Sequence, residues 1–304
     1  MPSDTISPSD IDTLMQYVQA GMRLPMTAEE YCTRLQISGD AANKISSDIG
    51  PLVAIYSPAS NAHSECLTFY IDTYPATCMI ASAILAEAQR AIQGSEYGEI
   101  VQAIKNLDQA TSDEERQKLQ KTIMDTIDAE VKTLDDDRKQ LQEVLNGLTP
   151  FMQLTVQHNH ALSHYNGTLD NIVSTEGNTL LDLQSTLDHL RAQAAQTGGA
   201  EYAALLVQIA DYERKLSDQQ AVVDALVTIR VDLLRTLELL GPATLILTTM
   251  VGGWSLSDDA LGSVHDMVDS DLRNASSVIV DRVLDKLLGK WTELREQVQG
   301  YPQA

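Results

Sequence analysis

The chain has 304 residues, of which 43% are hydrophobic and only 5% aromatic, and its 43 acidic and 21 basic residues give a formal net charge of −22. Such a surface repels phosphate backbones, which argues against nucleic acid as a partner, and it repels anionic lipid headgroups, so any membrane contact has to be apolar. The low aromatic content favours helices over sheets. The composition therefore predicts an all-α protein.

Signals for helix ends divide the first hundred residues into short helices. Ser7 is a good N-cap, and Pro8 suits the first helical position. A later short helix is predicted over residues 40–56, ending before Ser57-Pro58. Pro75 is expected to kink or split the apolar helix that follows, since proline lacks the backbone N–H that a helix interior needs.

A much longer apolar pattern begins at a capping box formed by Ser112 and Glu115, with apolar residues at steps of three and four. Pro150 is expected to bend this helix rather than end it, because the apolar face continues beyond it. After Asn166-Gly167 the pattern resumes. It stops at a polar turn, the candidate tip, made of Gln196, Thr197, Gly198 and Gly199.

A second long apolar pattern follows this turn and ends at Gly241-Pro242. Two long amphipathic helices joined by a short turn pack antiparallel, each burying the apolar stripe of the other. We therefore predict an elongated helical bundle extended by a long antiparallel coiled-coil stalk. The bundle is assigned to residues 1–110 and 241–304, and the stalk to residues 111–240 with its tip near residues 193–200.

No pattern of catalytic or metal-binding residues emerges. His160 and His164 lie four residues apart on one side of a helix, but neither an HExxH motif nor a Glu-x-x-His pair accompanies them. Their milder interpretation is a pH-sensitive face, whose protonation below about pH 6.5 loosens the packing. Phosphate-binding loops and nucleophile elbows are also missing from the sequence. We predict no enzyme activity, no metal and no cofactor.

The three cysteines, Cys32, Cys66 and Cys78, are expected to be buried reduced thiols, with a disulfide between the last two as the alternative. The polar, acidic start of the chain predicts no secretory signal peptide. The protein is therefore expected to be soluble, and either cytoplasmic until release or secreted without a classical signal.

The most membrane-like segment is the uncharged stretch at residues 239–257. Its candidate membrane-contact residues are Leu245, Ile246, Leu247, Val251 and Trp254. A buried helix is the favoured interpretation, because the stretch is short. Residues 66–86 allow the same two interpretations, and there Asp72 and Pro75 favour burial.

Three tracts of the sequence carry a resemblance to a known family. Residues 11–25 read IDTLMQYVQAGMRLP, residues 45–58 close on IYSP, and residues 287–294 read LLGKWTEL with a single Trp. In that order they are similar to the opening helix, the next helix and the closing helix of the A component of alpha-xenorhabdolysin-type binary toxins. The resemblance implies a pore-forming toxin of the cytolysin A type, lytic or haemolytic, that is soluble until a hydrophobic hairpin at the stalk end enters the bilayer and that assembles with a second component or with itself.

This sequence departs from the family at that hairpin. Residues 192–200 form a short polar turn, far below the roughly 20 apolar residues that span a bilayer. We therefore expect a toxin-like helical protein that binds a membrane or a partner subunit without inserting a conventional hairpin. The alternative is a non-toxic cytoplasmic coiled-coil scaffold that docks other helices.

Overall fold

The computed structural model of the protein describes residues 6–24, 26, 27, 30, 33, 52–94 and 97–302. Every regular element within these residues is a helix, so the predicted all-α class, a bundle with long helices, is confirmed. Cys32 and most of the helix predicted over residues 40–56 lie outside the described residues.

Two predicted helix starts are confirmed by their capping contacts. Helix α1 (Pro8–Met22) begins after Ser7, whose Oγ accepts the backbone N–H of Asp10 at 3.3 Å, while Asp10 Oδ2 accepts the backbone N–H of Ser7 at 2.9 Å. At the start of α7 (Asp113–Ala194), Ser112 Oγ accepts the backbone N–H of Glu115 at 3.2 Å. These bonds satisfy donors that the first helical turn leaves free.

Between α1 and α7, one predicted helix end is wrong and one predicted break is confirmed. Helix α4 (Leu52–Thr68) continues through Ser57-Pro58, so the stop expected there is wrong. The split at Pro75 is confirmed: a π-helical turn, η1 (Phe69–Thr73), comes directly before α5 (Tyr74–Ile92), in which Pro75 is the second residue. A wider π turn accommodates a proline that would otherwise clash with the preceding turn of an α-helix. Helix α6 (Gly98–Gln109) follows.

The two long helices are longer than their sequence patterns suggest. Helix α7 contains Pro150, as predicted, and also continues through Asn166-Gly167 without a break. Helix α8 (Gly199–Asp266) continues through Gly241-Pro242, where the sequence pattern placed an end. Leu240 and Ala243 on either side are buried, and their packing stabilises a helix that loses a single backbone hydrogen bond at the proline.

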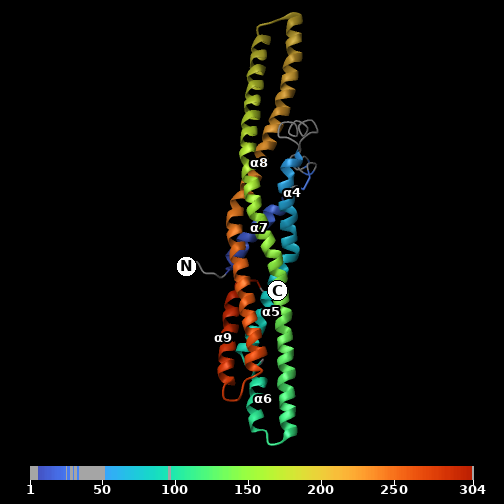
Figure 1. Ribbon diagram of the computed structural model, residues 1–304. Coiled ribbons are helices and arrows are strands. Elements are labelled where there is room, and N and C mark those ends of the chain that lie inside the picture. The colour runs from blue at the N-terminus through green and yellow to red at the C-terminus, as the bar shows by residue number, and fades with distance from the viewer. Residues whose placement is uncertain are drawn as a thin grey trace. The chain divides into compact units, whose positions relative to one another are not determined.

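The chain divides into two compact units, which we number. Unit 1 contains Met1–Gln16, Thr68–Leu154 and Pro242–Ala304, and it includes η2 (Met267–Leu272) and α9 (Val280–Val298). Unit 2 contains Tyr17–Leu67 and Thr155–Gly241. Figure 1 labels helices α4 to α9.

Unit 1 has a core in which α9 packs against α5 and α6. Trp291 of α9 is buried and donates its indole N–H to Tyr97 Oη at 3.0 Å, and Tyr97 donates in turn to Glu130 of α7 at 2.9 Å. Phe69 stacks on Phe151 with ring centroids 4.4 Å apart. An aromatic side chain that buries its polar end needs a hydrogen-bond partner there. The two hydrogen bonds therefore link α9 to α7 through Tyr97, the residue that precedes α6.

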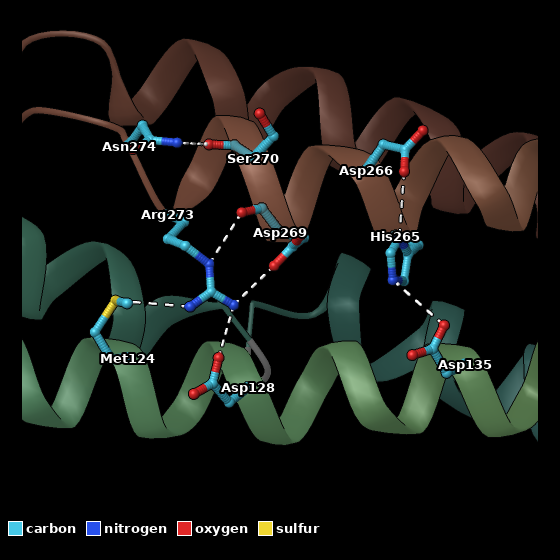
Figure 2. Close-up of polar contacts among 9 residues, drawn as sticks. All are labelled: Met124, Asp128, Asp135, His265, Asp266, Asp269, Ser270, Arg273 and Asn274. Carbon is cyan, nitrogen blue, oxygen red and sulfur yellow. Dashed lines mark hydrogen bonds and ion pairs between the residues drawn. The ribbon is translucent and has the colours of Figure 1, made fainter.

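Polar contacts show that α7 pairs antiparallel with α8 and η2 in unit 1. Figure 2 shows Arg273 donating from Nη2 to Asp128 of α7 at 2.7 Å and to Asp269 of η2 at 2.8 Å. His265 Nε2 lies 3.4 Å from Asp135 Oδ1 of α7. Residue numbers fall along α7 from Asp135 to Asp128 as they rise from His265 to Arg273, which is the pattern of antiparallel helices.

Both described cysteines are buried free thiols, so the reduced interpretation is confirmed for Cys66 and Cys78. Burial raises the pKa of Cys66 to about 12 and also raises the pKa of Cys78. Both thiols are therefore protonated and poorly nucleophilic at neutral pH.

Candidate membrane-contact and partner-contact site

Unit 2 contains a helical hairpin formed by residues 155–194 of α7 and residues 199–241 of α8, which lie side by side in Figure 1 up to the turn that joins them. Three polar contacts fix its register, from the base toward the turn: Arg230 with Asp170 at 2.5 Å, Gln219 with Glu176 at 2.6 Å, and Arg191 with Glu213 at 2.7 Å. Because α7 numbers rise as α8 numbers fall, the two arms are antiparallel.

The middle contact is buried inside an apolar seam. Gln219 Nε2 donates to the side-chain Oε2 and to the backbone oxygen of Glu176, and both residues are buried. Leu187 and Leu226 are buried in the same hairpin. A buried polar pair in an apolar helix seam penalises every other register, since a shift leaves both groups without partners.

The candidate tip residues form the connection between the two arms. Helix α7 ends at Ala194, Gln196 to Gly198 lie in the turn, and Gly199 begins α8 with a φ of +70°. That left-handed conformation is strained for residues with a Cβ, which explains a glycine there. Thr197 Oγ1 donates to the backbone oxygen of Gln193 at 2.9 Å and closes the turn.

The end of the hairpin is almost uncharged over a longer stretch than the turn itself. We call residues 192–210 the hairpin end; its only charged residue is Glu201. Tyr202, Leu206 and Val207 expose their side chains there, and Val207 is 72% exposed. The uncharged run predicted from the sequence ended before Glu201, although nine further uncharged residues follow that glutamate.

Charged residues border the hairpin end on both arms. We call Asp188, Arg191, Asp211, Glu213, Arg214 and Lys215 the collar. Lys215 Nζ lies 2.7 Å from Asp211 Oδ2, and this hydrogen bond, with a second from Arg214, lowers the pKa of Asp211. Arg191 joins the arms through Glu213 at 2.7 Å. The collar therefore separates the nearly uncharged hairpin end from the rest of the hairpin, which carries charged residues on both arms.

The five candidate membrane-contact residues of the 239–257 stretch lie on α8 in unit 1. Some of them are on the buried face of the helix and the others are on its outer face. Ile246, Leu247 and Trp254 are buried, and the Trp254 ring packs on Tyr301 at a centroid distance of 4.9 Å. Leu245 is exposed and Val251 is half-buried. The inner residues are thus part of the unit 1 core, and only the outer face is available for contact.

The histidines predicted to be pH-sensitive, His160 and His164, are both exposed on α7. The neighbouring His158 is buried, and its Nε2 lies 3.2 Å from Glu65 Oε2 of α4. Burial lowers the pKa of His158 and raises the pKa of Glu65. This pair could not be predicted from local sequence patterns, because its two residues come from different helices, α4 and α7.

The described residues form no metal site, and two of their helical segments are apolar enough for a membrane. Within the described part of the chain, no group of three or more His, Cys, Asp or Glu side chains is arranged to hold a metal ion. Two helical segments, Ser60–Ile92 and Gly199–Leu272, are long and apolar enough to cross a membrane. Core helices of soluble proteins meet the same criterion, so this composition alone assigns neither segment to a membrane.

The fold of the chain is that of solved α-helical toxin components. The crystal structure of XaxA from Xenorhabdus nematophila matches with a TM-score of 0.64 at 13% sequence identity, covering 97% of this chain and 95% of that one. YaxA from Yersinia enterocolitica matches with a TM-score of 0.58 at 13% identity, with the same coverage.

A pore assembly matches as well: a chain of the XaxAB pore complex from Xenorhabdus nematophila has a TM-score of 0.52 at 12% identity, covering 96% of this chain and 95% of that one. No protein-family model and no curated protein matches the sequence. The likeness is therefore one of fold, over nearly the full length of the chain.

Proposed function

We propose that this protein is a pore-forming-toxin-like helical protein that binds a membrane through the hairpin end and acts together with a partner subunit. The observation that carries the proposal is the exposed, nearly uncharged hairpin end bounded by the collar, on a fold shared with XaxA and YaxA. The match to a chain of the XaxAB pore complex supports the partner subunit.

The length of the hairpin end limits how deeply it enters a bilayer. On α8 it extends from Gly199 to Ala210, which corresponds to about 18 Å at 1.5 Å per residue. The hydrocarbon core of a bilayer is about 30 Å thick. The hairpin end therefore enters one leaflet, with the charged collar left among the headgroups, and does not span the bilayer by itself.

The energetics favour neutral over anionic lipid. Moving the exposed part of an apolar side chain such as Leu206 or Val207 into hydrocarbon contributes roughly 1–2 kcal/mol each. The net charge of −22 works against binding at an anionic surface, where basic residues normally supply the attraction. Binding is thus expected to be strongest on phosphatidylcholine vesicles and to weaken as anionic lipid is added.

Vesicle flotation with a matched pair of variants tests this proposal. Val207 and Val231 are both exposed valines of α8, at 72% and 58%, but only Val207 lies in the hairpin end. Val207→Glu is expected to abolish flotation with phosphatidylcholine vesicles, whereas Val231→Glu leaves it unchanged. Equal flotation of both variants, or no flotation of the wild-type protein at neutral or mildly acidic pH, refutes membrane binding through the hairpin end.

A further inference from the structure

In unit 1, helix α8 carries a second uncharged face, opposite its buried one, that exposes two leucines. Residues 239–257 contain no charged residue, and the inner residues Ile246, Leu247, Met250 and Trp254 are buried. On the outer face lie Leu245, which is 69% exposed, half-buried Thr249, exposed Gly252, and Leu256, which is 52% exposed. We call these four outer residues the α8 seam.

The spacing and chemistry of the α8 seam suit a second helix. Its members follow one another at steps of four, three and four residues, the repeat by which two helices pack along a common seam. A Cβ built on Gly252 meets nothing within 4 Å, so a partner backbone has room to approach closely. A helix that is apolar on opposite faces is usually covered on both.

The polar groups of this face are already satisfied within the helix. Thr249 Oγ1 donates to the backbone oxygen of Leu245 at 3.1 Å, and Ser255 Oγ donates to that of Val251 at 2.8 Å. Covering the face therefore leaves no hydroxyl without a hydrogen bond, which is the usual cost of burying threonine and serine. Burying this face against another helix therefore has a low desolvation cost.

The charges beside the α8 seam select the kind of helix. Along α8 the first charged residues on either side of the seam are acidic: Glu238 before the uncharged stretch and Asp259 after it. Asp258 points away from the seam, where it pairs with Arg138 and Gln142 of α7. A second copy of this chain, in either direction, places carboxylates opposite carboxylates, and each copy carries −22. A helix with Lys or Arg at both ends of an apolar stripe has the complementary charge.

Lipid fits the α8 seam less well than such a helix. The inner face of α8 is packed into unit 1, with Trp254 against Tyr301, so lipid cannot surround the helix while the unit stays folded. Helices that lie in the membrane surface carry basic residues toward the headgroups, and this one has acidic residues in those places.

We propose that the α8 seam, made of Leu245, Thr249, Gly252 and Leu256, docks one helix of a different polypeptide chain, apolar along its contact and basic at its flanks. The inference deepens the proposed function, because it gives the partner subunit a surface on this chain and a chemistry of its own.

Two glycines in unit 1 provide a matched test. Gly252 on α8 and Gly289 on α9 are both exposed, and a Cβ on either meets nothing within 4 Å, so the two positions are matched sites for a glutamine side chain that extends into solvent. The probes are two synthetic helices of about four heptads with the same Leu/Ala seam, one flanked by Lys and the other by Glu. Binding to the full chain is measured by calorimetry without vesicles, and circular dichroism checks that each variant is folded.

The Lys-flanked peptide is expected to bind the wild-type protein and Gly289→Gln equally, and to bind Gly252→Gln at least about tenfold more weakly. The Glu-flanked peptide is expected to bind the wild-type protein at least about tenfold more weakly than the Lys-flanked one. Equal binding to both variants, or no binding to the wild-type protein, overturns the proposal.

Two further measurements exclude the other occupants. Self-association of the wild-type chain that is lost in Gly252→Gln would assign the α8 seam to a second copy, and vesicle flotation lost in that variant would assign it to lipid; either result overturns the proposal. Peptide binding is measured without membranes. If the flotation experiment refutes membrane binding through the hairpin end, the test of the α8 seam is therefore unaffected.

Discussion

Replacing Leu187 by alanine is expected to destabilise the hairpin of unit 2 strongly, while the same change at Leu181 has little effect. Both residues lie on α7, but Leu187 is only 1% exposed and Leu181 is 67% exposed. Removing a fully buried leucine side chain costs about 2–5 kcal/mol, because the apolar surface and the packing around it are both lost. An exposed site changes stability by less than about 0.5 kcal/mol.

Hydrogen exchange measures this difference locally. Because the chain contains two units, a single free energy of unfolding does not describe it, whereas amide protection reports each segment separately. For Leu187→Ala, protection in the hairpin is expected to fall between about 30-fold and about 4,000-fold. Protection in Leu181→Ala is expected to stay near the wild-type level. Similar losses in both variants would mean that the arms do not bury each other's leucines, and the hairpin interpretation would be wrong.

Further predictions concern one histidine and two glycines. Burial lowers the pKa of His158 below its ordinary value of 6.5, so the unfolded chain takes up a proton first as the pH falls, and unit 2 loses stability on acidification below about pH 6.5. His158→Gln is therefore expected to show a shallower loss of hairpin protection between about pH 7.5 and 5.5, after correction for intrinsic exchange, whereas the exposed control His160→Gln keeps the wild-type slope. Gly147→Ala is expected to destabilise unit 1 by about 1–3 kcal/mol, because the new Cβ lies 2.9 Å from Thr73 Oγ1. Gly177→Ala is expected to stabilise its helix by about 0.5–1 kcal/mol, because the new Cβ meets no atom within 4 Å. Hydrogen exchange that shows both glycine variants stabilised, or both destabilised, would refute this explanation.

Local patterns predicted the starts and the turn of the helices well. The capping residues Ser7 and Ser112 are recognisable because their hydroxyls accept an N–H only three residues further on. The polar turn ending at Gly199 is equally local, since a few polar residues and one left-handed glycine join the two helices. Each of these features depends on a few neighbouring residues, which a sequence displays directly.

Features that depend on packing could not be predicted in the same way. Gly241-Pro242 has the composition of a helix end, yet α8 continues because the apolar residues around it are buried. The contact between His158 and Glu65 joins segments far apart in the chain, so the local spacing of histidines pointed to the exposed His160 instead. By contrast, the full extent of the hairpin end was present in the sequence and was missed only because Glu201 interrupts it.

The depth of the hairpin end in a bilayer tests the central claim most directly. Val207→Trp places a fluorescent side chain in the hairpin end, and Val231→Trp places one outside it; the two native tryptophans, Trp254 and Trp291, are buried in unit 1. Vesicles of phosphatidylcholine with bromine atoms on the acyl chains quench tryptophans that enter the hydrocarbon. Strong quenching of Val207→Trp, with none for Val231→Trp, is the result that we predict. Equal quenching of both variants, or none of either, would contradict membrane binding through the hairpin end.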